Sequence, residues 1–182
     1  AILSSSSLVE QYGKLGQFEK QEKHTARIKS SVGNLVNILN DFLSLDKIEQ
    51  GKIEVDKEIF DLNDFANDVR EELSGYLKPG QHIKYTHMGD EKVSQDKKIF
   101  RNVLLNLLSN ACKYSKENTE IEFNTEVADK IVIIKVSDKG IGIPESEQKN
   151  LFSKFYRAKN ATNIQGTGLG LNIVKRYVEL MD

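Results

Sequence analysis

Three asparagines and a lysine recur at helical spacing in the stretch Arg101–Ser115. Asn102, Asn106, Asn110 and Lys113 fall on one face of a helix with 3.6 residues per turn. Asparagine competes with its own backbone for hydrogen bonds and gains nothing intrinsic from a helix interior. The alignment of these residues therefore indicates a polar binding site, although a solvated helix face would give the same pattern.

The opposite face of this stretch is apolar. Leu104, Leu107, Leu108 and Ala111 form a stripe that needs a core, and Cys112 lies beside it, where we expect a buried and inert thiol. Because this is the only cysteine, an internal disulfide and a cysteine-based zinc cluster are excluded, which fits a reducing compartment.

Two glycine-rich turns offer a second kind of chemistry. The first glycine turn, Asp138-Lys-Gly-Ile-Gly-Ile-Pro144, follows an apolar strand and offers an acceptor and an approachable backbone to a flat ligand. The second glycine turn, Gly166-Thr-Gly-Leu-Gly-Leu171, opens the last helix, where backbone N–H groups favour phosphate oxygens. Each turn alone is a weak signal. The second lacks the spacing of the dinucleotide fingerprint.

The segment between the two turns is aromatic and basic, then polar. Pro144 predicts a short helix to about Phe152, leading into Phe152-Ser-Lys-Phe-Tyr-Arg157. Aromatic residues at this spacing also fit an ordinary core, and Arg157 an ordinary surface. Residues 158–165, the lid segment, are polar without periodicity and predict a mobile loop.

Two amphipathic helices are predicted upstream, from Ala1 to about Leu15 and from Phe18 to about Gln50. The apolar stripe of the second helix is too broad for one hairpin to bury. We therefore expect two chains to form a homodimeric four-helix bundle. Docking of the stripe on the second domain of the same chain is the alternative.

Strands and helices follow after Gly51. The predicted strands are 52–55, 59–60, 83–85, 121–127 and 130–136, and the predicted helix caps are Asp61 or Asn63 and then Asp96. The last strand is apolar enough for a central position. The order predicts an α+β fold, in which a helical hairpin, residues 1–50, precedes an α/β sandwich, residues 51–182.

The charge and hydropathy of the sequence limit the kinds of partner that the chain can bind. The 182 residues carry a formal net charge of −1 with 29% charged residues, so no overall field favours nucleic acid or an anionic membrane. No run of about 18 apolar residues is present, and no signal peptide is recognisable. We expect no membrane contact by this chain and a cytoplasmic location, with a membrane anchor elsewhere in a longer protein left open.

The polar helix face, the first glycine turn, the Phe-x-x-Phe-Tyr-Arg segment and the second glycine turn, in this order, resemble the N, G1, F and G2 boxes of the sensor histidine kinases, within the GHKL ATP-binding superfamily. The resemblance covers about residues 50–182 as the catalytic ATP-binding domain. The preceding hairpin is similar to the dimerisation and histidine-phosphotransfer domain. The family implies a sandwich of one mixed sheet and several helices, with ATP between the central helix and a lid.

The resemblance also implies roles for individual residues. Asn110 would coordinate Mg²⁺ on the phosphates of ATP, with Asn106 close by; an asparagine oxygen suits this hard cation. Lys113 would contact phosphate and Tyr114 the nucleotide, while Asp138 would accept the adenine amino group. The remaining implied nucleotide-site residues are Gly140, Gly142, Ile143, Arg157, Gly166, Thr167, Gly168, Leu169, Gly170 and Leu171.

The family's phosphoacceptor histidine stands in a His-Glu/Asp-x-x-Thr-Pro-Leu motif, and Ala1-Ile-Leu is similar to the residues just after it. We therefore expect a protein histidine kinase that is cut at both ends, with its acceptor histidine upstream and a response regulator receiver domain as partner. His24 lacks the motif and is expected to be an ordinary surface residue. No catalytic residue is assigned within the chain. The family's closing strand hairpin would follow Asp182, so we expect an unprotected sheet edge.

Two other functions stay open. A GHKL ATPase such as a chaperone or mismatch-repair protein would carry a glutamate, which activates water, where this sequence has Asn106; this difference argues against hydrolysis. A non-catalytic ATP-sensing dimerisation module needs only nucleotide binding and the hairpin.

Overall fold

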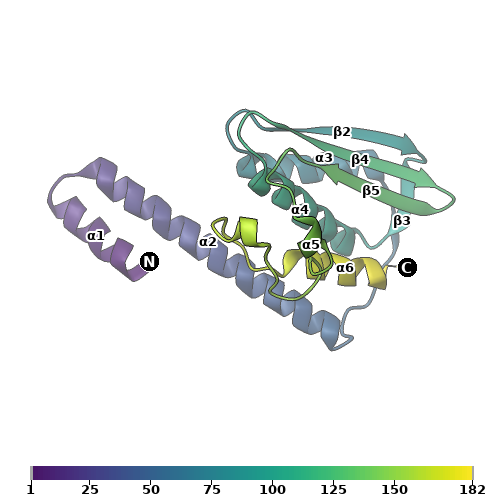
Figure 1. Ribbon diagram of the computed structural model, residues 1–182, viewed down its shortest axis with the longest axis horizontal. Helices are drawn as coiled ribbons and strands as arrows, with labels where there is room; N and C mark the ends of the chain where they lie inside the picture. The colour runs from purple at the N-terminus through teal and green to yellow at the C-terminus, as the bar shows by residue number, and fades with distance from the viewer. Residues whose placement is uncertain (1, 182) are drawn as a thin grey trace. The chain divides into compact units, whose positions relative to one another are not determined.

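The computed structural model describes residues 2–181, which belong to two compact units, Ala1–Asp46 and Lys47–Asp182. The helices and strands are labelled in Figure 1. Among the described residues, none of the helices has both the length and the apolar content that crossing a membrane requires.

The first unit is a helical hairpin, as the apolar periodicity predicts. Helix α1 (Ile2–Lys14) is followed by α2 (Phe18–Glu49), and Gly16 has a left-handed φ of +66° in the turn between them. His24 is half-buried and stacks on Tyr12 with 5.6 Å between ring centroids, so the expectation of an ordinary surface residue is wrong. The ring is covered because α1 folds back over this part of α2.

The rest of α2 keeps an exposed apolar stripe, whose members are Val32, Leu35, Val36, Ile38, Leu39, Phe42 and Leu43. Leu39, for example, is 55% exposed. Exposure of this size agrees with the reason for expecting a second hairpin. The four-helix bundle itself stays a prediction.

The second unit begins with a two-stranded sheet that flanks a helix. Strand β1 (Glu58–Asp61) pairs antiparallel with β3 (Lys92–Gln95), and the Asp61 side chain caps α3 (Leu62–Glu72) by accepting the N–H groups of Asn63 and Asp64. The predicted strand at 52–55 is wrong: these residues have no ladder partner and are irregular. Strand β3 was not predicted. After α3 comes a short 3₁₀ helix, η1 (Leu73–Tyr76).

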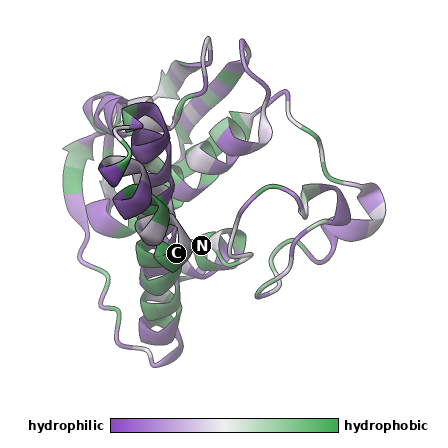
Figure 2. Cartoon of the chain, turned by 90° about the vertical axis from the view of Figure 1, so that its left-hand side faces the viewer, coloured by the Kyte–Doolittle hydropathy of each residue, from purple (hydrophilic) through white to green (hydrophobic). Residues whose placement is uncertain are grey.

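The larger sheet has the order β2-β4-β5. Strand β2 (His82–Gly89) is parallel to β4 (Glu120–Ala128), which is antiparallel to β5 (Ile131–Ser137). The prediction that the apolar strand β5 is central is wrong for the described residues, since β4 is central and Ile131 is 62% exposed. Buried and less buried residues alternate along β4. Figure 2 colours the chain by hydropathy, and both hydrophilic and hydrophobic residues occur in its strands.

The core lies between this sheet and the helices on one of its faces. Helices α3 and α4 (Lys97–Tyr114) cover that face, and α6 (Gly170–Leu180) packs on α4 (Figure 1). Leu104 and Leu108 of α4 and Phe123 of β4 are fully buried. Helix α4 therefore has one face in the core, and its polar face is left for the site. The architecture is the predicted α+β type, but with two separate sheets among the described residues instead of one.

Between β5 and α6 the chain is mostly irregular. Helix α5 (Glu145–Gln148) is shorter than predicted, with Pro144 as its extended N-cap residue, and η2 (Lys159–Ala161) is a 3₁₀ turn within the lid segment. Residues 149–155, which the sequence predicts to continue the helix in part, form turns and a bend, and residues 156–157 are irregular.

Candidate functional site

Helix α4 is fixed at its N-terminus by Asp96, which is 5% exposed. One carboxylate oxygen accepts the N–H groups of Lys98 and Ile99, both at 2.9 Å, and the other accepts the N–H of Asp56 at 2.9 Å. Burial would raise the pKa of Asp96, but these three backbone hydrogen bonds outweigh it and lower the pKa. The predicted N-cap is thus confirmed, and the start of α4 is held by an ionised group.

The two faces of α4 separate as predicted. The apolar side contributes the buried residues Ile99, Phe100, Val103, Leu104, Leu108, Ala111 and Cys112. Leu107 is only half-buried, so it does not belong to the fully buried stripe. Cys112 is 1% exposed and burial raises the pKa of its thiol, which confirms the expected inert cysteine.

On the polar side, Asn106, Asn110, Lys113 and Tyr114 are half-buried, whereas Asn102 is exposed. The Asn106 side chain donates a hydrogen bond to the Asn102 carbonyl at 2.9 Å. The Lys113 ammonium lies over the Tyr114 ring, 4.8 Å from its centroid, which is a cation–π contact. The polar face therefore ends in a lysine and a tyrosine that are held together.

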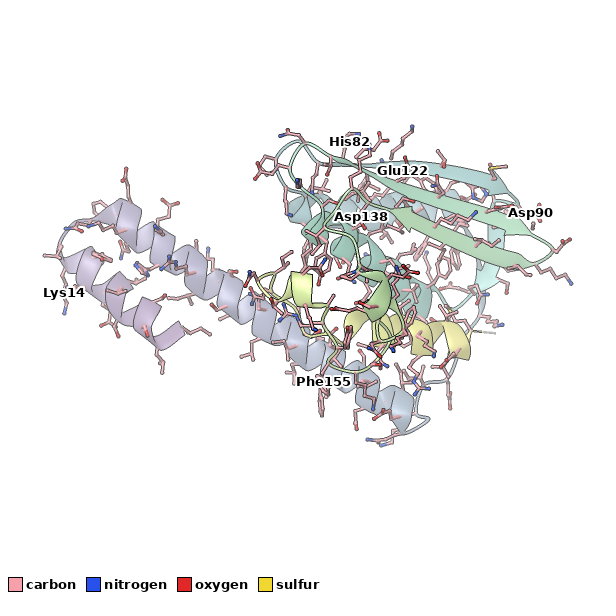
Figure 3. All side chains as sticks on the ribbon, in the orientation of Figure 1. Lys14, His82, Asp90, Glu122, Asp138 and Phe155 are labelled. Carbon is pink, nitrogen blue, oxygen red and sulfur yellow. The ribbon has the colours of Figure 1, made fainter. Side chains whose placement is uncertain are left out.

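The first glycine turn is joined to the C-terminal end of α4. Gly140 donates its N–H to the Asp138 carboxylate at 2.8 Å, and the hydroxyl of the buried Ser115 lies 3.4 Å from the same oxygen. Ser115 and Gly140 also form an antiparallel bridge. Figure 3 labels Asp138 where β5 ends, next to the end of α4. The turn thus presents an exposed carboxylate beside Tyr114.

The second glycine turn lies against the polar face of α4. A methyl group on Gly170 would come within 2.7 Å of the Asn106 side-chain oxygen, and one on Gly166 within 2.6 Å of the Lys113 nitrogen. The absence of side chains at these two glycines is what allows the close approach. The structure therefore brings the lid end of the chain onto Asn106 and Lys113.

The other predicted residues of the two glycine turns differ in backbone conformation, hydrogen bonding and burial. Gly168 has a φ of +72°, and the Thr167 hydroxyl accepts the N–H of Leu169 at 3.1 Å. Leu169 is 2% exposed, so its side chain belongs to the core and only its backbone can serve a ligand, while Leu171 is half-buried. In the first turn, Gly142 has a φ of +65° and Ile143 is 45% exposed.

The lid segment has internal structure that its composition does not predict. The Arg157 guanidinium donates hydrogen bonds to the carbonyls of Ala161 at 2.8 Å, Thr162 at 3.2 Å and Ile164. Ala158 and Ala161 are buried beneath it. Arg157 therefore closes the lid segment on itself, which fits the predicted role of a basic anchor.

Two further side chains, which the sequence did not single out, tie the lid segment to its neighbours. The Glu147 carboxylate accepts the Tyr156 hydroxyl at 3.1 Å and the N–H of Lys159 at 2.9 Å, and Asn160 donates to the Gly142 carbonyl at 3.0 Å. The pKa of Tyr156 is raised, first by burial and then by the hydrogen bond to the Glu147 carboxylate and its negative charge. Neither residue stands in a pattern, because each contact depends on the path of the loop.

Comparisons with known proteins agree with this geometry. Residues 95–182 match the family model described as histidine kinase-, DNA gyrase B-, and HSP90-like ATPase. The chain is also 34% identical, over 168 residues, to the circadian input-output histidine kinase CikA of Synechococcus elongatus. That alignment covers 89% of this chain and 22% of CikA, so the chain spans about a fifth of this relative.

Solved structures give the same result. Full-length ShkA, in complex with AMPPNP, superposes with a TM-score of 0.72 and 25% identity over 89% of this chain and 34% of ShkA. The Acinetobacter baumannii histidine kinase AdeS has a TM-score of 0.71 over 97% of this chain and 84% of AdeS, with 21% identity, a likeness of fold. The fold and site define an ATP-binding domain of the GHKL type. The chain contains a catalytic ATP-binding domain of the kind found in sensor histidine kinases.

Proposed function

We propose that this chain binds Mg²⁺–ATP and serves a protein histidine kinase, which transfers the γ-phosphate of ATP to a histidine and then to an aspartate of a response regulator receiver domain. The observation that carries the proposal is that both ligand-facing turns meet one helix. The first glycine turn is bridged to the end of α4 through Ser115, and the second lies on Asn106 and Lys113. In this proposal an adenine acceptor and a phosphate site lie along a single element.

In this proposal Asp138 accepts the adenine amino group, while Lys113 and the N-terminus of α6 neutralise phosphate charge. The close approach of Gly166 to Lys113 and of Gly170 to Asn106 brings the second glycine turn, at the N-terminus of α6, beside a cation and an amide, and this set of groups suits phosphate oxygens. Phosphoryl transfer depends mainly on such positioning and charge neutralisation.

The donors on α4 also fit magnesium. Among the described residues no group of three or more histidine, cysteine, aspartate or glutamate side chains could hold a metal ion. Mg²⁺ in nucleotide sites takes few protein ligands and completes its shell with phosphate oxygens and water. The Asn110 amide oxygen would be such a ligand, and the bound ion would neutralise charge on the phosphates.

The contacts of Asn106 favour phosphotransfer over hydrolysis. Its amide N–H group donates to the Asn102 carbonyl, which a carboxylate at this position could not do. An amide also cannot accept a proton from an attacking water as a glutamate would. A non-catalytic ATP-sensing module remains the second candidate, because nucleotide binding and the hairpin would suffice for it.

The proposal extends to domains and partners. We infer a dimerisation hairpin at residues 1–50 and a catalytic domain at residues 51–182; the two compact units, which divide between Asp46 and Lys47, support this division. The exposed stripe of α2 supports a homodimer, and the single buried Cys112 suits a reducing, cytoplasmic compartment.

Nucleotide binding is tested by titrating the chain with ATP in the presence and absence of Mg²⁺. Asn110→Ala should remove the Mg²⁺ dependence, and Asp138→Ala should weaken binding by about tenfold or more, the loss of a hydrogen bond to an ionised group. Asn102→Ala is the matched control, because the Asn102 side chain is exposed and donates to the Lys98 carbonyl of its own helix. Unchanged binding in both site variants would reject the proposed site.

Phosphotransfer is tested in a longer chain that includes the natural upstream residues. Radiolabelled ATP should give a phosphoprotein that is stable to base and labile to acid, as phosphohistidine is. Steady phosphate release without labelling would instead support the ATPase, and nucleotide binding with neither outcome would support the sensing module.

A further inference from the structure

The C-terminal end of α4 is held by two side chains from the loop before β2. The Lys78 ammonium donates hydrogen bonds to the carbonyls of Lys113, at 2.8 Å, and Ser115. The Gln81 amide donates to the carbonyls of Cys112 at 3.0 Å and of Lys116 at 2.9 Å. Neither Lys78 nor Gln81 is part of a nucleotide-site motif in the sequence.

These bonds answer a general need of helices. The last four carbonyls of a helix lack partners within the helix, and a buried carbonyl without a partner is costly. Gln81 is 7% exposed and Cys112 is 1% exposed, so water does not readily replace this bond. The positive charge of Lys78 also complements the negative end of the helix dipole.

The two capping side chains form one unit. The Gln81 side-chain oxygen accepts the N–H of Lys78 at 2.9 Å, so each residue orients the other. The turn between them is fixed as well: the Pro79 carbonyl accepts the N–H of Asn118 at 3.0 Å, and Gly80 has a φ of +70° against the Asn118 side chain. Loss of either capping side chain should therefore loosen the whole loop end.

The capped residues are those that face the proposed nucleotide. Lys113 and Tyr114 end the polar face of α4, and Ser115 bridges to Gly140 and lies near the Asp138 carboxylate. A methyl group on Gly140 would approach the Tyr114 carbonyl within 2.6 Å, so the first turn is seated on this backbone. A shift of the end of α4 would move Asp138 and Tyr114 together.

We propose that Lys78 and Gln81 are positioning residues of the nucleotide site, which hold the adenine side of the site in place without touching the ligand. The inference rests on the proposed function, in which Asp138 receives the adenine amino group. Because Tyr114 and Asp138 depend on the capped backbone, the binding of both ATP and ADP should depend on it.

The test measures ATP and ADP dissociation constants of Lys78→Met and Gln81→Leu, at a temperature where each variant is fully folded. Both constants should rise by about tenfold, a size expected for lost bonds to a charged or buried group. Lys78→Arg should restore binding, since it keeps a cation that donates to carbonyls. If Lys78→Met does not fold, Lys78→Gln, which keeps an N–H donor, replaces it.

Arg70→Met is the matched control, because Arg70 also donates from a long cationic side chain to a backbone carbonyl, that of Ile83 at 2.9 Å, but in β2. It should lower stability and leave both dissociation constants unchanged. Hydrogen exchange should rise at the amide of Gly140 in Lys78→Met and stay unchanged there in Arg70→Met.

The outcomes separate the two proposals. If the unmodified chain binds neither nucleotide, or Asp138→Ala binds both normally, the proposed site fails and this inference fails with it. If Asp138→Ala loses binding while Lys78→Met and Gln81→Leu bind as the unmodified chain does, the positioning role alone is rejected. Equal losses of affinity in Lys78→Met and Arg70→Met would also reject it, since a general loss of stability would then explain both.

Discussion

The two glycine turns meet α4 in different ways. In the first turn, Gly140 is seated on backbone: a methyl group there would lie 2.6 Å from the Tyr114 carbonyl and 2.5 Å from the Asp138 carboxylate. In the second turn, Gly166 and Gly170 face side chains, and the nearest atoms are the far ends of Lys113 and Asn106. The first turn is therefore built into the end of α4, whereas the second rests on groups that can rotate away.

The second turn has its own fixed point, but this point is not on α4. Gly168 packs against the backbone of Phe155 and Tyr156, whose nearest atom lies 2.7 Å from the place that a methyl group on Gly168 would take. Figure 3 labels Phe155 in this segment. The second turn is thus tied to the residues just before the lid segment, and Arg157 and Glu147 hold the lid segment together.

The difference between backbone and side-chain contacts suits a binding site that is rigid at one end of its ligand and adaptable at the other. A backbone contact cannot yield without moving α4, while the Lys113 and Asn106 side chains can change rotamer at small cost. In the proposed nucleotide site, the adenine side would then be preformed, and the phosphate side would be able to adapt to its ligand.

The largest effect is expected from Gly140→Ala, which attacks the fixed turn. The added methyl group has no room between two oxygen atoms, so the free energy of unfolding should fall by about 1–3 kcal/mol, the usual cost of overpacking. Nucleotide binding should be lost with it, because Asp138 has to move. Urea unfolding and ATP titration measure both effects.

Gly75→Ala is the control for that substitution, since no atom lies within 4 Å of its methyl position. It should be neutral or stabilise by about 0.4–1 kcal/mol, because alanine has less conformational freedom in the unfolded chain. If Gly140→Ala proved as stable as Gly75→Ala, the first turn would not be seated on α4 as described.

A smaller effect is expected from Asp96→Ala, which loosens the other end of the helix that carries the fixed turn. Loss of an N-cap costs about 0.5–2 kcal/mol at neutral pH. The pKa of Asp96 is lowered in the folded protein, so its contribution is present above the unfolded pKa, which is about 3.9. The contribution is lost as the pH falls through the lower folded pKa.

The difference in stability between the unmodified chain and Asp96→Ala should therefore be constant from pH 7 to about pH 5 and should shrink below pH 4. Asp96→Asn keeps a capping oxygen without the charge, so its own stability should lack this acid-dependent term. A difference that persisted unchanged to pH 2 would show that the carboxylate charge has no part in the cap.

Local signals explain which parts of this architecture the sequence could predict. Asp61 and Asp96 predict the starts of α3 and α4, because an N-cap side chain accepts hydrogen bonds from N–H groups two and three residues away. The hairpin of β4 and β5 is predicted by its short turn, in which Asp129 and Lys130 take positive φ values. The two faces of α4 follow in the same way from helical spacing.

Contacts between distant segments explain what the sequence could not predict. The pairing of β1 with β3, and the edge position of β5, depend on which strands meet in space, and apolar content alone does not decide it. The contacts of Gln81 and Glu147 were missed because a single polar residue in a loop or in a one-turn helix is not part of a periodic pattern. The assignment of ligand roles to Asn110 and Asp138 stays a prediction, which the titrations above address.

The smallest change in stability is expected from Gly166→Ala, which tests the adaptable turn. Gly166 has no left-handed φ, and its methyl group would meet only the movable end of Lys113, so stability should stay within about 0.5 kcal/mol of the unmodified chain or rise slightly. The displaced ammonium would still lie near the phosphates. ATP affinity should therefore fall only a few-fold, and less for ADP, which has one phosphate fewer. Lys113→Met, which removes the ammonium altogether, should weaken ATP binding more than Gly166→Ala does. A loss of stability as large as that of Gly140→Ala would mean that the second turn is as rigidly seated as the first.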